Sequence, residues 1–347
     1  MRKKLLPVLL TIALAIALLT VGALAAAPDN VIYVNANDTT ADTETGVGTE
    51  SNPYNSLDAA VLAAPDGSVI EILSDVTSTG FSISKDVSFR GAENDVENDK
   101  YTISFSGGII TNNCTIEFNN CDVTFYGITV GYSINAGSGT TITLNNASVV
   151  MDVQDSVSGY GARHGIYSSG SNNVLNIQNN SELTIRNYES NAITWDGTTH
   201  QINITGNSKY MSDGNRSGFT GTFNVKIENS EVEVINSTGN ASNGSHFEII
   251  NSTINFNDNG DHGLSAGTLT IDHSQVTATG NGANGVHTNN TFTVKNNSVL
   301  TIQNNDCGIV SPWTLPAALH IGAGESSIDS TSTITITNNE GPGMLLK

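Results

Sequence analysis

The stretch Val225-Lys226-Ile227-Glu228-Asn229-Ser230 carries the pattern that decides the fold, because it recurs along most of the chain. In it, apolar and polar residues alternate, and an asparagine and a small residue follow. Alternation with a period of two is typical of β-strands, whose successive side chains point to opposite faces. Further copies occupy residues 116–121, 142–147, 175–181, 202–208, 248–252, 269–274, 292–298 and 334–338.

One column of the aligned copies contains asparagine almost throughout. Its members are Asn120, Asn146, Asn180, Asn207, Asn229, Asn251, His273 and Asn297. Three consecutive steps in this column are 22 residues long, and a fixed period of this size indicates a solenoid. Two or three short strands with their turns fill such a period, so each period forms one coil of a parallel β-helix. We expect the asparagines to stack as a ladder at a tight turn, because asparagine tolerates left-handed backbone there.

The stretch 52–64 departs from the strand pattern and predicts a short helix. Ser56 can cap it, and Leu57, Ala60 and Val61 share one face. A solenoid exposes an apolar end unless another element covers it, and this helix is placed to cover the first coil. The sequence therefore predicts an all-β solenoid over 69–347, preceded by an N-terminal strand and capping helix over 28–68.

The first residues have the features of a secretory signal. Arg2, Lys3 and Lys4 precede a long apolar run that ends in alanines. A basic start, an apolar middle and a small-residue cleavage site predict a signal peptide over 1–27 and therefore export. The alternative is an uncleaved membrane anchor, since the run is long enough to span a bilayer. Either way, we expect contact with a membrane only through this segment.

Charge and cysteine content exclude other classes. The chain has 13 Lys and Arg against 33 Asp and Glu, a net charge of -20, so it lacks the basic surface that nucleic acid requires. Its three cysteines, Cys114, Cys121 and Cys307, cannot all pair within one chain. Cys114 and Cys121 would form a disulfide only if the fold brings them together, and the simpler interpretation is three small buried side chains.

Several N-terminal motifs match a known group of β-helix proteins. With Asn52-Pro53-Tyr54, the Leu57 to Val61 helix pattern and Ile83-Ser84-Lys85-Asp86-Val87, the chain resembles the pectin-lyase-like superfamily. The resemblance spans residues 31–346 and implies a right-handed parallel β-helix with an N-terminal capping helix. It is nearest to the adhesin-like, non-catalytic branch of cell-surface proteins. Because the chain ends soon after the copy at 334–338, we expect either a fragment of a longer surface protein or a released one.

The resemblance implies a secreted, cell-surface module that contacts polysaccharides, cell-surface glycans or proteins of host or neighbouring cells. The alternative is a polysaccharide lyase or glycoside hydrolase on the same scaffold. Members that cleave galacturonans carry Asp-Asp, Gly-His-Gly and Arg-Ile-Lys motifs, which Arg163-His164-Gly165 and Asp261-His262-Gly263 match only in part. Glycoside hydrolysis needs two carboxylates about 5–9.5 Å apart, and the repeats place no acidic pair at equivalent positions. We therefore predict no catalytic residues.

A second recurrent element is a small residue followed by an apolar one, as in Gly165-Ile166 and Gly285-Val286. We interpret it as a bend at which glycine relieves restrictions on φ. Around these bends stand the candidate binding residues His164, Tyr167, Trp195, His262 and His287. Stacked coils would align them on one side, where rings and polar groups can hold a sugar. The simpler alternative is that the histidines bond to turn backbone.

We predict no metal site and no cofactor. Four residues are of types that bind metal: His164, His262, His287 and Cys307. They come from different coils, and no two of them have the close sequence spacing that is typical of metal ligands. The Asp-rich stretch 257–261 invites a Ca²⁺ interpretation, yet it lacks the terminal glutamate of an EF-hand loop. Solvated turn carboxylates are the simpler explanation.

Overall fold

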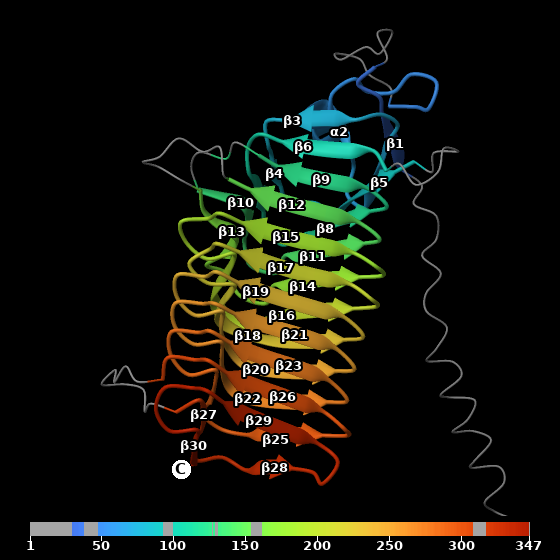
Figure 1. Cartoon of the computed structure of the whole chain (residues 1–347). Helices are drawn as coiled ribbons and strands as arrows, with labels where there is room; N and C mark the ends of the chain where they lie inside the picture. The colour runs from blue at the N-terminus through green and yellow to red at the C-terminus, as the bar shows by residue number, and fades with distance from the viewer. Residues whose placement is uncertain are drawn as a thin grey trace, which may run out of the picture.

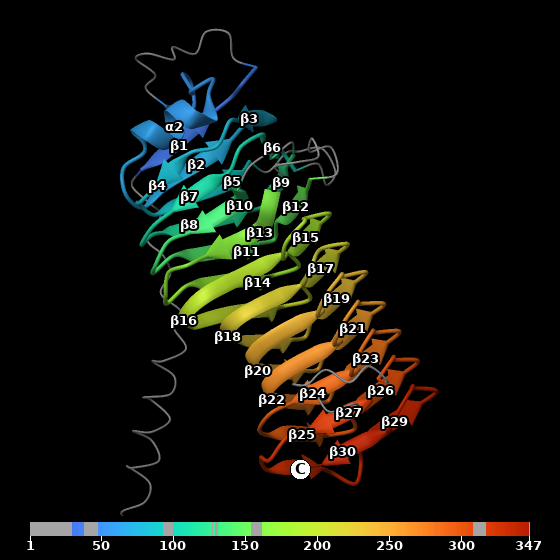
Figure 2. The ribbon, with the colours of Figure 1, turned by 90° about the vertical axis from the view of Figure 1, so that its left-hand side faces the viewer.

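The computed structural model describes residues 30–37, 48–92, 100–126, 128, 131–153, 162–307 and 317–346. The predicted signal segment over 1–27 lies outside these residues. Within them, strands stack into a long rod of coils (Figures 1 and 2), and every pairing between the named strands is parallel. The chain is therefore a parallel β-helix, which confirms the predicted fold class. Among the described residues, no helix is long and apolar enough to cross a membrane.

Each complete coil contributes one strand to each of three stacks, which we call faces A, B and C in chain order. Face A consists of β1 (Val31–Val34), β2 (Ser68–Ile72), β5 (Val87–Gly91), β8 (Thr115–Asn119), β11 (Thr141–Asn145), β14 (Val174–Gln178), the second parts of β16 (Ile193–Thr205), β18 (Phe219–Glu228), β20 (Ser242–Ile250) and β22 (Leu264–Asp272), and then β25 (Phe292–Lys295) and β28 (Ser326–Ile328).

Face B lies toward the viewer in Figure 1 and contains one strand of each coil in strict order. Its strands are β3 (Val76–Ser78), β6 (Thr102–Phe105), β9 (Asp122–Phe125), β12 (Ser148–Asp152), β15 (Glu182–Arg186), β17 (Lys209–Asp213), β19 (Glu231–Ile235), β21 (Thr253–Asn257), β23 (Gln275–Thr279), β26 (Val299–Gln303) and β29 (Thr333–Thr337).

Face C follows face B in each coil and holds the predicted binding residues. Its strands are β4 (Ser82–Ile83), β7 (Ile109–Thr111), β10 (Gly131–Ala136), β13 (Ala162–Ser168), the first parts of β16, β18, β20 and β22, and then β24 (Val286–Thr288), β27 (Leu319–Ile321) and β30 (Met344–Leu346). Strands β16, β18, β20 and β22 turn the corner from face C to face A without a break, so these two faces form one sheet.

In the core, equivalent apolar residues of successive coils stack on one another. On face B, Val232 pairs with Ile254, and Ile254 pairs with Val276 in the next coil. Aromatic rings stack in the same way, with Phe105 and Phe125 at 4.8 Å between ring centroids. Because each inward position meets its equivalent one coil away, an alternating sequence of moderate hydrophobicity can fill a continuous core.

A single described helix, α2 (Leu57–Ala63), covers the first coil as predicted (Figure 2). Ser56 Oγ accepts a hydrogen bond of 3.4 Å from the backbone N–H of Ala59, which satisfies one of the free donors of the first turn. Leu57, Ala60 and Val61 are buried and join the core. Their burial covers apolar residues that the first strands would otherwise leave in water.

Candidate functional site

The asparagine column marks the corner between faces A and B. All eight of its residues adopt left-handed backbone, with φ between 47° at Asn251 and 62° at Asn180. Two side-chain links between coils are present, from Asn146 Nδ2 to Asn120 Oδ1 (3.0 Å) and from Asn251 Nδ2 to Asn229 Oδ1 (2.6 Å). Most of these side chains are exposed, so the column serves mainly the backbone turn.

The residue after each asparagine makes the more regular ladder at this corner. From Ser181 onward it is a serine, buried in every copy except the half-buried Ser230, and its hydroxyl accepts from the backbone N–H of its equivalent one coil earlier. The bonds from Ser208 to Ser230, Ser230 to Ser252 and Ser252 to Ser274 measure 3.2, 3.1 and 3.1 Å. The sequence pattern identified these residues only as a small residue after the asparagine, and their ladder was missed.

A second ladder, which we did not predict, fills the corner between faces B and C. It consists of inward asparagines that follow a left-handed residue, as Asn259 follows Asp258 and Asn281 follows Gly280. Asn281 Nδ2 donates to Asn305 Oδ1 (2.8 Å) and to Phe256 O (2.9 Å). The signal was available, because Asn215, Ser237, Asn259 and Asn281 also lie 22 residues apart.

Two files of positions run along the outer side of face C, three residues apart within each coil. The first file contains His164, Asn191, Ser217, Asn240, His262 and Asn284. The second contains Asn135, Tyr167, Thr194, Thr220, Asn243, Ser265, His287 and His320, as the strand register shows. Of the predicted binding residues, His164 and His262 therefore share one file, and Tyr167 and His287 share the other.

The glycines of the recurrent bend are required for space and not for a left-handed backbone. A Cβ atom on Gly165 would lie 2.5 Å from Ile185 Cγ2, and one on Gly285 would lie 2.5 Å from Ile302 Cγ2. Neither residue has a positive φ, so the predicted relief of φ restrictions is wrong for both. Close approach of the bend to face B fixes where the outward files begin.

Three rings gather on the outer side of β10 and β13, and we call them the tyrosine cluster: Tyr132, His164 and Tyr167. The Tyr132 and Tyr167 rings stack with centroids 4.4 Å apart and planes 12° apart, and His164 lies 5.6 and 5.2 Å from them. All three side chains are half-buried. The cluster therefore presents preformed aromatic surface to solvent, and Tyr132 is a member that sequence reasoning missed.

Polar neighbours fix the cluster's orientation and charge. His164 Nδ1 lies 2.9 Å from Thr194 Oγ1, which also accepts a 2.9 Å hydrogen bond from Asn191 Nδ2. Because Asn191 donates to Thr194, the threonine hydroxyl is free to donate to His164. Partial burial, and then the charge of Asp196, raise the pKa of Tyr167. Its hydroxyl therefore remains a neutral hydrogen-bond donor at physiological pH.

A second ring group, the histidine stack, lies further along the same face and contains His262, His287 and His320. The centroids of His287 and His320 are 4.7 Å apart, and those of His262 and His287 are 5.6 Å apart. His262 Nδ1 accepts from the backbone N–H of Asn284 (3.2 Å), and burial lowers the pKa of His262 although the charge of Asp261 opposes this. This bond matches the alternative in which a histidine supports the turn.

Trp195 does not lie on the outer surface, contrary to its selection as a candidate binding residue. Its side chain is 0% exposed, and its ring packs in the core against His200 with centroids 5.1 Å apart. The register pairs Tyr167 with Thr194, so Trp195 stands one residue further along the strand. A shift of one residue turns a side chain to the opposite face of a strand.

Of the potential metal ligands, His262 and His287 lie close together, with ring centroids 5.6 Å apart. Among the described residues, no group of three or more His, Cys, Asp or Glu side chains could hold a metal ion. In the stretch 257–261, the Asn259 side chain is turned inward to the asparagine ladder, where its amide donates to Asn281 Oδ1 (2.9 Å). Cys114, Cys121 and Cys307 are free and buried, so the disulfide alternative does not occur.

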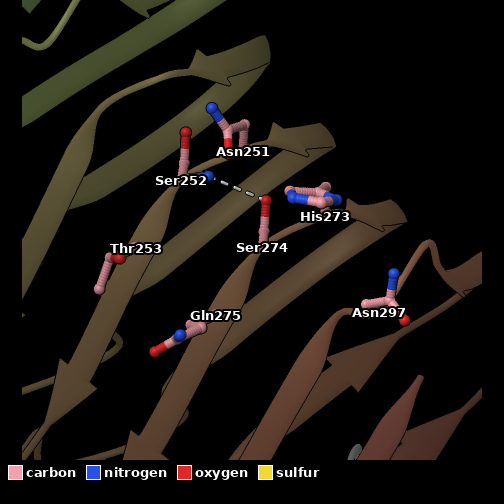
Figure 3. A pocket seen from close by; sticks show the side chains of 7 residues that line it. All are labelled: Asn251, Ser252, Thr253, His273, Ser274, Gln275 and Asn297. Atoms are coloured by element: carbon pink, nitrogen blue, oxygen red, sulfur yellow. Dashed lines mark hydrogen bonds between the residues drawn. The ribbon is translucent and has the colours of Figure 1, made fainter. Parts of the chain in front are cut away.

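A shallow pocket of about 280 Å³ opens at the corner between faces A and B, around His273 (Figure 3). Its lining is polar and contains no Asp, Glu, Lys or Arg, and Thr253 and Gln275 belong to it from face B. Figure 3 shows His273 between Asn251 and Asn297, where the other coils carry asparagine. The pocket therefore continues from the asparagine column onto the outer side of face B.

Comparison with known proteins adds little beyond the fold. No protein-family model and no curated protein matches the sequence. The structure is similar to a GH136 lacto-N-biosidase from Eubacterium ramulus (10% identity, TM-score 0.36, covering 88% of this chain and 68% of that one). It is also similar to a rhamnogalacturonan lyase (11% identity, TM-score 0.31, 92% and 90% covered). Such distant likenesses concern the architecture alone.

Proposed function

We propose that this chain is an exported, non-catalytic β-helix of the adhesin type, which holds a glycan against the outer side of face C. The observation that carries the proposal is the tyrosine cluster. Half-exposed rings pack against the apolar faces of sugars, while their polar edges bond to sugar hydroxyls. The cluster offers both, from Tyr132 and Tyr167 together with His164.

Preorganisation favours binding at this cluster. Stacking fixes the two tyrosine rings relative to each other, and the contact with Thr194 fixes His164. Side chains that are already ordered lose little conformational freedom when a ligand arrives, so more of the contact energy appears as affinity. The cluster therefore differs from isolated surface tyrosines, which must first be immobilised.

The second file supplies a polar surface between the two ring groups. In the consecutive coils between Tyr167 and His287, this file consists of Thr194, Thr220, Asn243 and Ser265. Their hydroxyl and amide groups both donate and accept hydrogen bonds. The Thr194 and Ser265 hydroxyls are buried against His164 and His287. Thr220 and Asn243 are half-buried and exposed, so a glycan chain along the rod would meet these two groups about 4.8 Å apart, in neighbouring coils. Repeated weak contacts of this kind add up to useful avidity.

Export and a role at the cell surface rest on the N-terminal segment and on the resemblance to adhesin-like β-helices. The arrangement of Arg2, Lys3 and Lys4 before an apolar run supports a signal peptide. A β-helix is a rigid rod, which suits presentation of one binding face at a distance from its attachment. The net charge of -20 favours a partner that is neutral or bridged by cations.

A glycan array probed with the full chain, followed by titration of the best ligand, tests the proposal. Tyr167→Ala should weaken binding about tenfold, which corresponds to roughly 1.4 kcal/mol, because the cluster loses its central ring. Tyr33→Ala, on β1 of face A, is the matched control and should bind as the wild type does. No array ligand, or equal affinity in the wild type and Tyr167→Ala, would refute the proposal.

The alternative of a lyase or hydrolase on this scaffold is tested in parallel. Pectate, alginate and the array ligand are incubated with the protein, with and without Ca²⁺. We expect the substrate to remain unchanged in every sample. New reducing ends, or an unsaturated product that absorbs in the ultraviolet, would assign the protein to the enzymes instead.

A further inference from the structure

The outer side of face B changes its chemistry abruptly along the rod. Up to β19 its outward positions include many charges, such as Glu182 and Arg186 on β15 and Glu231 and Glu233 on β19. On β21, β23, β26 and β29 none of the outward positions is charged. In a chain of net charge -20, four consecutive strands without an outward charge form a distinct surface. We call it the neutral patch.

Hydroxyl and amide side chains dominate the neutral patch. Its central file contains Asn255, Thr277, Thr301 and Thr335, and the file beside it contains Thr253, Gln275, the apolar Val299 and Thr333. These side chains are half-buried or exposed, and nearly all of them can both donate and accept hydrogen bonds. The patch can therefore pair with a partner whose own groups are hydroxyls and amides, without any ionic contact.

The geometry of the patch is regular. The four strands pair without a register shift, so equivalent side chains repeat about every 4.8 Å across the strands and about every 6.6 Å along them. In Figure 1 these strands lie side by side and nearly parallel on one side of the rod. Such a surface suits an extended, repetitive partner better than a compact one.

The pocket around His273 lies along one edge of the neutral patch. Thr253 and Gln275, the first outward residues of β21 and β23, belong both to the patch and to the lining of the pocket. A cavity of about 280 Å³ is at the small end of ligand sites and has room for one small ring. A chain of sugars on the patch can place one unit there.

We propose that the neutral patch binds an uncharged polysaccharide, with one sugar in the pocket around His273. Charge selects the class of partner, because an anionic polymer would meet the acidic chain without a basic residue on the patch to attract it. The patch lies on face B and the tyrosine cluster on face C, so the inference adds a second surface to the proposed function. A rod with two binding faces can join two glycans.

A pull-down experiment tests this proposal. The full chain is mixed with microcrystalline cellulose, with chitin or with immobilised pectate, and the protein that each polymer removes from solution is measured. We expect binding to at least one of the two neutral polymers and none to pectate. The double variant Thr277→Lys, Thr301→Lys should bind at least about tenfold more weakly, because the charges must be desolvated against the sugar. Thr124→Lys, in the same file on β9, is the matched control and should bind as the wild type does.

Several results would overturn the proposal. They are binding to neither neutral polymer, equal binding by the double variant, or stronger binding to pectate. If the wild type sediments as a dimer and the double variant as a monomer, the patch is instead an interface between copies of this chain. Comparison of the double variant with Tyr167→Ala separates the two proposals, since the neutral patch requires the double variant to lose more of the binding to cellulose or chitin. If Tyr167→Ala alone abolishes that binding, the neutral patch fails and the tyrosine cluster stands.

Discussion

The hydroxyl oxygen of Ser274 accepts a hydrogen bond of 3.1 Å from the backbone N–H of Ser252, one coil earlier. The same bond joins Ser230 to Ser252 and Ser274 to Ser298. The backbone N–H of each of these serines is therefore satisfied by the next coil and not by its own. The stability of one coil depends on its neighbour, as in other stacked-repeat proteins.

Removing one hydroxyl from this ladder should destabilise the rod. Ser252→Ala leaves the N–H of the half-buried Ser230 without its acceptor, and it removes the bond from the buried Ser252 Oγ to Ile250 O. We expect a loss of about 1–3 kcal/mol, the usual cost of an unsatisfied buried group. Urea unfolding followed by circular dichroism measures it, with the exposed Thr253→Ala as control. Equal midpoints for the two variants would show that the ladder contributes nothing.

The two asparagine columns should respond differently to leucine. Asn281 is buried, and its loss leaves Asn259 N–H, Phe256 O and Asn305 Oδ1 short of partners. Asn229 is exposed, so its replacement costs mainly the left-handed backbone that leucine disfavours, about 1–2 kcal/mol. Asn281→Leu should therefore lower the unfolding midpoint more than Asn229→Leu. The reverse order would contradict the assignment of the inner ladder as the stronger one.

The three thiols should be inert in the native protein. Burial raises the pKa of Cys121 to about 12 and that of Cys307 to about 11, and it also raises the pKa of Cys114. Because the thiolate is the reactive form, a disulfide-exchange reagent at mildly alkaline pH should modify almost none of them. Unfolding in urea should release all three, as counted by absorbance. Rapid modification of the native protein would show that these side chains are accessible.

Stability should decrease on acidification because of buried histidines. Burial lowers the pKa of His200 and of His262 below the ordinary value of 6.5. The unfolded chain therefore takes up protons before the native state does, so this contribution is complete above pH 6.5 and is lost as the pH falls through the lower folded pKa values. His262→Gln should show a smaller decrease in melting temperature between neutral and mildly acidic pH than the wild type.

The control for the pH experiment is His246→Gln, because His246 lies at a half-buried outward position on face A. This variant should keep the wild-type dependence of melting temperature on pH. If His262→Gln keeps it as well, the burial of His262 does not control the response to acid.

The fold could be predicted from the sequence because most coils repeat the same local pattern of residues. Alternation around Val232 and Ile254 predicts strands, and the 22-residue step predicts that their equivalents meet. The asparagines marked the left-handed corner because few other residues accept that backbone. These features are local or recur along the chain, so the pairing of distant strands follows from the repeat itself.

The candidate site was harder to predict because one residue of register decides which side of a strand a side chain occupies. Trp195 was selected because it stands near the recurrent bend, whereas the pairing of Tyr167 with Thr194 turns Trp195 into the core. Tyr132 was missed because β10 follows an irregular part of the repeat, with a register shift between Gly131 and Tyr132. Only the stacking of neighbouring coils brings it to Tyr167.

The most direct test of the proposed function is a crystal structure of the protein soaked with the ligand that the glycan array identifies. The account predicts ligand density against the Tyr132 and Tyr167 rings, with sugar hydroxyls within hydrogen-bond distance of His164 or of the second file of face C. Density of the same ligand confined to another surface, with the tyrosine cluster bare, would contradict it.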